Sequence, residues 1–404
     1  MKIRDVIHSA NTGLDAIKRA PVLEYPTDLR CIRIQDISQG KPFSEWAYTK
    51  TTANDYKKFK LCKNDVLVAR TGATVGVSYF VKNDVESVFN NGSIRLKVNE
   101  NANANFLYYL INTKEFLSFI DNVSCVATQP NLRIENLLRF DFPDFTIEKQ
   151  TEISNILSTY DELIENNNKR IAILEQMAEN LYKEWFVRFR FPGYENAKFE
   201  DGIPADWEYV KLGEKLNFER GVGYSSADLM DADNVLLSMN NIRPWGGFIR
   251  DYSRKYSGKF KEFQVVKQND LIMSITDMTQ DRRIIGYVGL VPHSEQIRII
   301  CTHLMKVTSV NSEYDNVFLY GLFNFSGLSR YISERATGAN VLGLTANILN
   351  NVKWYFPTFE LIYKYCAVAK PLYEAIEQYE EQKDNLIKQR DLLLPRLMSG
   401  KLEV

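Results

Sequence analysis

The sequence predicts an α+β fold: two similar domains, mixed and strand-rich with helices, separated by two long helices that form an antiparallel coiled coil. A stretch of about forty residues, 147–186, lacks Pro and Gly and carries apolar residues at alternating three- and four-residue spacing. From residue 203 the chain repeats the order of motifs in its first half, and a second long helical pattern closes it. The order domain, helix, domain, helix therefore predicts a pseudo-two-fold internal repeat.

The first long pattern has a single apolar face. Its seam consists of Ile153, Ile156, Tyr160, Leu163, Ile171, Leu174, Ala178, Leu181 and Trp185. A helix of this length would be a rod of roughly 60 Å, whereas an average globular helix has only about 11–12 residues. The opposite face is rich in Glu, Lys, Asn and Arg, so the apolar stripe needs a partner.

The rest of the first half contains shorter elements. Alternating or apolar runs predict strands at 29–37, 65–69 and 93–98 and a helix at 105–120. After the long helix, period-two alternation from Trp185 to Phe191 predicts a short strand that the Pro192-Gly193 turn closes.

The second half repeats these motifs. Asp65 aligns with Asp270, at the start of the same apolar strand in each copy. The other aligned segments are 31–38 with 236–243, 106–111 with 318–323, and 140–145 with 354–359. A loop insertion, DMTQDRR at 277–283, lengthens the second copy. A tandem duplication explains the agreement.

The second long helix, about 361–398, provides the partner that the first requires. Its heptad positions are Leu372, Ile376, Tyr379, Leu386, Leu393 and Leu397. Lys383 and Arg390 interrupt this seam, and Asn167 interrupts the first, which would fix the register of an antiparallel pair at some cost in stability. In the alternative, each helix folds onto its own domain.

These patterns divide the chain into five segments. The predicted boundaries are 1–145 for the first domain, 146–190 for the central helix, 191–203 for a linker, 204–358 for the second domain and 359–404 for the C-terminal helix.

Composition favours an intracellular, cytoplasmic protein. The five cysteines form no CxxC pair, the N-terminus is no signal peptide, and no apolar run is long enough to span a membrane. The formal net charge of −1 lacks the basic excess of a freestanding nucleic-acid binder, so affinity for DNA would need help from partner subunits.

Motifs for catalysis are absent. No GK dipeptide is followed by the Ser or Thr that a phosphate-binding loop needs, and no PP dipeptide of an amine methyltransferase occurs. His303 lies near Cys301, but two residues do not make a metal site. We therefore expect no catalytic residues and no metal in this chain.

Several segments resemble one family, the specificity subunits of type I restriction–modification systems. LEQMAENLYKEWFVRFRFPGYE (174–195) and KQRDLLLPRLMSGKLEV (388–404) are similar to the two conserved regions of that family. NDVLVARTGATVG (64–76), GIPADWEYVKLGE (202–214) and VATQPNL (126–132) resemble its target-recognition domains. The second copy departs from the last motif, since it has NVLGLTANIL at 340–349.

The resemblance implies a function without chemistry. Each target-recognition domain would read one half of a bipartite double-stranded DNA site. The helices would space the domains and dock two methyltransferase subunits, and restriction subunits would join them. S-adenosylmethionine, ATP and Mg²⁺ would be bound by those partners and not by this chain.

Base edges are read mostly by Arg, Lys, Asn and Gln, with Ser and Thr adaptable. The candidate DNA-binding residues in loops of the first copy are Arg33, Gln35, Lys41, Arg70, Thr71 and Thr74. In the second copy they are Asn240, Asn241, Arg243, Thr279, Gln280, Arg282 and Arg283. We favour Arg282 and Arg283, because two arginines in an inserted loop are hard to explain by packing. Trp46 and Trp245 are interpreted as core or rim residues.

The polar face of the first long helix is a candidate docking surface for the methyltransferase subunits, with Glu165, Lys169 and Arg170 as the residues to test. Two other classes of function stay open at this point. One is a non-catalytic coiled-coil scaffold with duplicated protein-binding domains, and the other is an enzyme whose site the motifs do not reveal.

Overall fold

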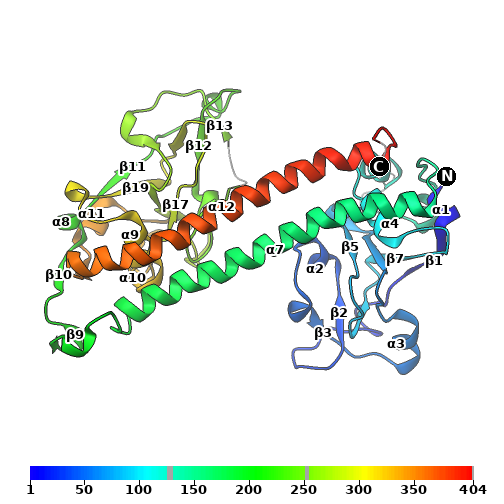
Figure 1. The fold of residues 1–404 in the computed structure, drawn as a ribbon, viewed down its shortest axis with the longest axis horizontal. Coiled ribbons are helices and arrows are strands. Elements are labelled where there is room, and N and C mark those ends of the chain that lie inside the picture. The colour runs from blue at the N-terminus through cyan, green and yellow to red at the C-terminus, as the bar shows by residue number, and fades with distance from the viewer. Residues whose placement is uncertain (125–130, 251–253, 403–404) are drawn as a thin grey trace. The chain divides into compact units, whose positions relative to one another are not determined.

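The computed structural model describes residues 1–124, 131–250 and 254–402 (Figure 1). The chain divides into two compact units, Met1–Asn166 with Gln382–Val404, and Asn167–Glu381. Each unit contains one mixed domain and a part of each long helix, α7 (Ile147–Phe186) and α12 (Phe359–Met398), which have 40 residues each. None of the described helices is long and apolar enough to cross a membrane.

The first unit begins with the elements drawn in blue and cyan in Figure 1. Its helices are α1 (Ile3–Val6), α2 (Ile34–Ser38), η1 (Phe43–Glu45), α3 (Ala53–Phe59), η2 (Gly72–Thr74), α4 (Ala104–Leu110), α5 (Lys114–Ser124) and α6 (Ile134–Leu137). Its strands are β1 (Ile7–Thr12), β2 (Arg30–Ile32), β3 (Ala47–Tyr48), β4 (Val66–Ala69), β5 (Ser78–Phe80), β6 (Ser87–Phe89) and β7 (Ser93–Val98).

These strands form two sheets. One is antiparallel with the order β1-β7-β4-β5, and the other has the order β3-β2-β6, in which β2 and β6 run parallel. Strand β4 is buried on both faces: Val66 and Val68 belong to one apolar cluster and Leu67 to another. This double burial explains why β4 has a continuous apolar sequence rather than an alternating one.

The second unit follows α7 and carries the remaining short elements. Its helices are η3 (Tyr194–Asn196), α8 (Leu212–Lys215), η4 (Ser226–Asp228), η5 (Met239–Asn241), η6 (Glu262–Gln264), η7 (Val310–Ser312), α9 (Asn316–Phe325), α10 (Leu328–Ser333) and α11 (Ala346–Asn351). Its strands are β8 (Phe199–Glu200), β9 (Ile203–Pro204), β10 (Glu208–Lys211), β11 (Leu216–Arg220), β12 (Val235–Leu237), β13 (Arg254–Lys255), β14 (Val265–Val266), β15 (Leu271–Ser274), β16 (Thr276–Asp277), β17 (Val288–Leu290), β18 (Arg298–Ile300), β19 (Leu304–Ser309), β20 (Leu342–Gly343) and β21 (Lys353–Phe356).

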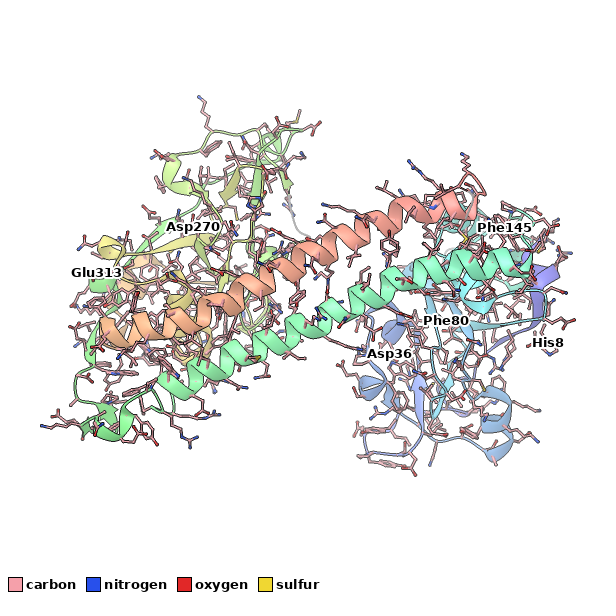
Figure 2. All side chains as sticks on the ribbon, viewed as in Figure 1. His8, Asp36, Phe80, Phe145, Asp270 and Glu313 are labelled. Atoms are coloured by element: carbon pink, nitrogen blue, oxygen red, sulfur yellow. The ribbon has the colours of Figure 1, made fainter. Side chains whose placement is uncertain are left out.

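The second domain repeats the topology of the first. Its main antiparallel sheet has the order β11-β19-β15-β17, and its smaller sheet contains the parallel pair β12 and β18 with β13 at the edge. Strand β15 is again buried on both faces, with Leu271 and Met273 in one cluster and Ile272 in another. Asp270, labelled in Figure 2, immediately precedes it as Asp65 precedes β4. The duplicated motifs in the sequence thus form the same elements.

Helix starts are also repeated. The side chain of Asn103 accepts backbone hydrogen bonds at the start of α4, and that of Asp315 does so at the start of α9. Side-chain acceptors at this position satisfy backbone N–H groups that have no partner within the helix. The aligned motifs FLYYLI (106–111) and FLYGLF (318–323) each begin three residues after the cap.

Within each unit, the segments of α7 and α12 run antiparallel. In the first unit, Phe145, which precedes α7, lies 3.6 Å from the position a Cβ would take at Gly400, and Arg390 contacts Asp161. In the second unit, Arg170 donates to Tyr379, and the Tyr182 ring packs edge-on against Tyr365. As residue numbers rise along α7, those of the contacted α12 residues therefore fall.

Four details of the sequence interpretation are wrong. The predicted strand from Trp185 to Phe191 does not form, because α7 continues through Phe186 and residues 187–191 form neither helix nor strand. The predicted helix 105–120 is two helices, α4 and α5, and the predicted strand 29–37 ends at Ile32, before α2 begins.

The last of the four concerns the alignment of 140–145 with 354–359. The backbone bridges pair Lys2 with Asp141 and Lys211 with Lys353, and each lysine immediately precedes a short helix. Asp141 therefore corresponds to Lys353, two residues before the position suggested by aligning Phe142-Pro143 with Phe356-Pro357. The pairing of each segment with its neighbouring strand fixes this register, and the sequence motif alone gives no information about that pairing.

Candidate nucleic-acid interface

In the first domain, three segments meet at the end of β4. The Arg70 guanidinium donates from Nη2 to Oδ1 of Asn131 at 3.1 Å, and Thr71 forms a backbone bridge with Asn131. The backbone N–H of Arg70 donates to the carbonyl of Gly92. The motif at 126–132 therefore reaches this site through Asn131, while 126–130 lie outside the described residues.

Two arginines here have unused donors. Nε and Nη2 of Arg33 and Nε of Arg70 are buried and have no hydrogen-bond partner in the structure. A buried donor without an acceptor costs about 1–3 kcal/mol. Arg33 immediately follows β2, and Arg70 immediately follows β4.

The other predicted residues of the first copy differ in exposure. Gln35 is exposed on α2. Lys41 is half-buried, with its Nζ 3.8 Å from Oδ1 of the buried Asp36, which also accepts from the backbone N–H of Arg33 at 2.9 Å. Thr71 and Thr74 are half-buried around η2, where φ of Gly72 is +79°. This positive φ explains the glycine in the TGAT motif.

In the second domain, the predicted residues 240–243 divide into three environments. Asn240 is exposed. Asn241 is buried, and its side chain is fully engaged there. Its Oδ1 accepts from the backbone N–H of Ser238 at 2.9 Å, and its Nδ2 donates to the carbonyl of Ile249 at 3.1 Å. Arg243 points to α7, where its Nη2 lies 2.6 Å from Oε1 of Glu175. Asn241 and Arg243 thus both have structural partners.

The inserted loop is fixed by the buried Asp277. Its Oδ1 accepts from both the backbone N–H and the hydroxyl of Thr279 at 2.8 Å, and its Oδ2 accepts from the backbone of Ile284 at 3.2 Å. Gln280 donates to the carbonyl of Ala339 at 3.0 Å. The loop therefore has a defined shape and contacts the segment that precedes β20.

The two favoured arginines have different roles in this loop. Arg282 has a φ of +54° and is half-buried, with Nη1 donating to the carbonyl of Ser333 at the end of α10 at 2.9 Å. Arg283 is exposed and lies 2.6 Å from Asp281, itself exposed. Packing therefore explains Arg282 in part, whereas Arg283 is available at the surface.

Trp245 joins this loop to the preceding one. Its backbone N–H donates to the carbonyl of Arg283 at 2.8 Å, and its side chain is 58 % exposed with a φ of +68°. Trp46 in the first domain is instead 1 % exposed. The sequence alone predicted the same role, core or rim, for both tryptophans. The exposed side chain of Trp245 makes it a candidate for contact with a nucleotide, and the buried side chain of Trp46 is not one.

The predicted docking residues already have interaction partners. Glu165 accepts from Nζ of Lys82 at 2.8 Å. Arg170 donates to the hydroxyl of Tyr379 at 3.1 Å, and its guanidinium lies over that ring at 5.2 Å. Lys169 also has an interaction partner.

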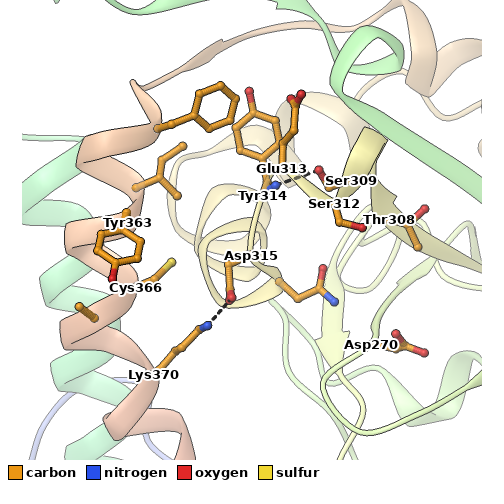
Figure 3. A pocket seen from close by; sticks show the side chains of 14 residues that line it. Asp270, Thr308, Ser309, Ser312, Glu313, Tyr314, Asp315, Tyr363, Cys366 and Lys370 are labelled. Atoms are coloured by element: carbon orange, nitrogen blue, oxygen red, sulfur yellow. Dashed lines mark hydrogen bonds and ion pairs between the residues drawn. The ribbon is translucent and has the colours of Figure 1, made fainter.

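A hollow of about 820 Å³ lies beside the start of α12 in the second unit (Figure 3). An ion pair of 2.6 Å between Asp315 and Lys370 lies at its wall, near the thiol of Cys366. Burial, together with the nearby Asp315 charge, raises the pKa of Cys366 to about 12, so its thiolate is disfavoured. Among the described residues, no group of three or more His, Cys, Asp and Glu could hold a metal ion.

Comparison with known proteins shows which proteins this chain is similar to. The model of the type I restriction modification DNA specificity domain matches residues 1–176. The MjaIX specificity subunit of a type I restriction enzyme from Methanocaldococcus jannaschii is 26 % identical over 82 % of this chain and 76 % of its own length. The putative MjaX specificity subunit from the same organism is 24 % identical over 100 % of this chain and 93 % of its length.

The fold has a solved relative as well. The crystal structure of the type I restriction–modification S subunit from M. genitalium superposes with a TM-score of 0.61 at 18 % identity, covering 98 % of this chain and 95 % of that one. Residues 1–176 therefore match the DNA specificity domain of type I restriction modification systems. The chain as a whole is similar in sequence to specificity subunits of type I restriction enzymes and similar in fold to a solved S subunit.

Proposed function

We propose that this subunit recognises a bipartite DNA sequence, with each domain reading one half. The observation that carries the proposal is that two domains of the same topology have different side chains at equivalent positions. The residues that follow β2 and β4 are Arg33 and Arg70 in the first domain. Those that follow β12 and β15 in the second are Ser238 and Ile275. A charged site and a neutral one favour different bases.

Several exposed polar side chains near these strands could contact base edges directly. These residues are Gln35 in the first domain and Asn240, Thr279, Gln280 and Arg283 in the second. Gln and Asn pair with adenine and Arg pairs with guanine in the major groove. Arg33, Lys41, Arg70, Thr71, Thr74 and Arg282 would support the same contacts from half-buried positions.

The long helices would act as spacers. Two readers on one face of B-DNA must be separated by about one helical turn, roughly 34 Å, or a multiple of it. A flexible linker could not hold such a separation to one base pair, whereas continuous helices of 40 residues could.

The helices would also dock two methyltransferase subunits, and restriction subunits would complete the assembly. S-adenosylmethionine, ATP and Mg²⁺ would then be bound by those partners. The near-zero net charge of the chain supports this division, because partners that clasp the DNA would supply most of the phosphate contacts. Charge reversals of Glu165, Lys169 and Arg170 should weaken assembly, and intact assembly in all three variants would argue against this surface.

A domain exchange tests the reading. The chain is co-expressed with its methyltransferase subunit, and modified adenines are mapped before and after residues 204–358 are replaced by the corresponding domain of a relative. We expect one bipartite motif, of which only one half changes. An unchanged motif after the exchange would reject the proposal.

A further inference from the structure

The segment Asn241–Arg250 connects the second domain to both long helices. It is closed as a hairpin, since Ile242 and Phe248 form an antiparallel bridge and the backbone N–H of Ile249 donates to the carbonyl of Asn241 at 2.8 Å. The buried Asn241 amide adds a hydrogen bond to the Ile249 carbonyl. We call this segment the arginine hairpin, because an arginine lies on each of its two arms.

The first arginine contacts α7. Arg243 faces Glu175 with two nitrogens, Nη2 at 2.6 Å from Oε1 and Nη1 at 3.4 Å from Oε2. Gly247 leaves room for this guanidinium, since a Cβ there would lie 2.6 Å from Nη2 of Arg243. The geometry is the two-pronged arrangement in which arginine binds a carboxylate most specifically.

The second arginine contacts α12. Arg250 donates to Oε2 of Glu377 and lies 3.7 Å from Glu380, while the backbone N–H of His293 donates to Oε1 of Glu377 at 3.0 Å. The side chains of Arg250, Glu377 and Glu380 are only 20–22 % exposed. This pair is therefore less screened by solvent than the Arg243 pair, whose side chains are 45 % and 37 % exposed.

The hairpin also contacts the inserted loop. At its tip, the Trp245 N–H donates to the carbonyl of Arg283, and the Gly247 N–H donates to the carbonyl of Val288 in β17 at 2.9 Å. One short segment thus connects α7, α12 and the loop that carries the candidate reading residues. In the first domain, Ser38 aligns with Arg243, and Asp36 occupies the place of Asn241 and pairs with Lys41.

We propose that Arg243 and Arg250 are positioning residues that fix the reading loop of the second domain to the two helices. This inference rests on the proposed bipartite reading and assigns Arg243 to the helix rather than to a base. Loosening either arm would let the reading loop shift relative to the helices. The bases read would stay the same, but the permitted gap between the half-sites would widen.

The test uses the full chain in complex with its methyltransferase subunit. The variants are E175Q, the double variant E377Q/E380Q, and the charge exchange R243E/E175R with its single reversals. The matched control is E374Q on α12, since Glu374 is exposed and forms none of these contacts. Modified adenines are mapped on DNA that contains the native target and the same half-sites with the gap one base pair longer or shorter.

We expect methylation at the altered gaps to rise about tenfold relative to the native gap in E377Q/E380Q, less in E175Q and not in E374Q. The charge exchange should restore the native ratio that each single reversal loses. A changed base in the second half-site would overturn the proposal, because Arg243 would then read DNA. An unchanged ratio would overturn it as well. A parent motif that is not bipartite would instead reject the proposed function.

A second measurement covers variants that do not assemble. Hydrogen exchange of the amides at 242–250 in the full chain should be faster in E377Q/E380Q than in E374Q, because the hairpin loses its contact with α12. Equal exchange rates would reject the positioning role without any need for DNA.

Discussion

Asp161 of α7 accepts two side-chain hydrogen bonds, from Arg390 of α12 and from Tyr109 of α4. Nη1 of Arg390 lies 2.7 Å from Oδ1, and the Tyr109 hydroxyl lies 2.6 Å from Oδ2. Burial and this carboxylate raise the pKa of Tyr109. The carboxylate therefore joins the first domain to both helices, and Arg390, which interrupts the apolar seam, has a polar partner.

Replacing Asp161 should destabilise the first unit. In D161N the ion pair is lost while a hydrogen-bond acceptor for Tyr109 remains. The Asp161 and Arg390 side chains are 25 % and 29 % exposed, so solvent screening limits the loss to about 1–2 kcal/mol. Scanning calorimetry should show a lower melting temperature for the transition that includes this unit.

The neighbouring Glu162 provides the control for this change. It is exposed and, among the described residues, it has no ion pair, so E162Q should change stability by less than about 0.5 kcal/mol. A double-mutant cycle with R390Q then isolates the coupling between Asp161 and Arg390. A coupling energy of zero would contradict the interpretation of this contact.

At the position that corresponds to Tyr109, the second domain has Gly321, and packing replaces the polar contact. A Cβ at Gly321 would lie 2.2 Å from Cδ2 of Tyr182, whose side chain is fully buried. We expect G321A to cost about 1–3 kcal/mol through overpacking. Its control is G223A, where nothing lies within 4 Å of the added methyl group. Equal unfolding midpoints in denaturant for the two variants would contradict this prediction.

Long-range periodicity made most of the fold predictable. The apolar seams predicted both long helices to within two residues at their ends, because a three- and four-residue spacing over forty residues has no other common explanation. The duplicated motifs predicted two similar domains, and Asp65 and Asp270 precede equivalent strands as aligned. Each signal extended over many residues, so single exceptions such as Arg390 did not obscure it.

The errors arose where the signal was short. Alternation from Trp185 to Phe191 is compatible with a strand, but Trp185 and Phe186 are buried as part of α7. Among the candidate site residues, sequence could choose polar types in loops but could not show their partners. The Asn241 side chain donates to the backbone carbonyl of Ile249, and a sequence pattern does not show backbone partners. Arg243 pairs with Glu175, which is distant in the sequence.

Two of the buried cysteines, Cys31 and Cys366, should be unreactive in the folded chain. Burial raises the pKa of Cys31 to about 11, against the opposing charge of Arg33, and that of Cys366 to about 12. At pH 8 the smaller thiolate fraction should slow the reaction with iodoacetamide, relative to an unperturbed thiol, about a hundredfold for Cys31 and about a thousandfold for Cys366. Mass spectrometry after timed quenching measures the rates, and the urea-unfolded chain is the control.

The same shifts give a direction for stability at high pH. Because the folded pKa values lie above the unfolded value near 9, the protonated thiols contribute their full stability below pH 9. That contribution is lost as the pH rises from about 9 toward 11 or 12. Rapid alkylation of Cys31 in the folded chain at pH 8 would contradict both expectations.

Arg282 and Arg283 should respond differently to removal, although they are adjacent. Arg283 is exposed, with a surface carboxylate as its neighbour, so R283A removes a charge that can reach a phosphate. We expect weaker DNA binding and a salt dependence of log K reduced by about one phosphate contact. Arg282 holds the carbonyl of Ser333, so R282A should weaken binding by distorting the loop and leave the salt dependence nearly unchanged.

Fluorescence anisotropy with a duplex that carries the mapped target, titrated between about 50 and 200 mM salt, measures both quantities. R335A is a suitable control, because Arg335 is exposed and stacks on Tyr331 outside the inserted loop. If R282A reduces the salt dependence as much as R283A does, then Arg282 leaves Ser333 on binding and also contacts phosphate. If neither variant changes the salt dependence of log K, the inserted loop does not contact DNA phosphates. The part of this loop in recognition would then be limited to Thr279 and Gln280.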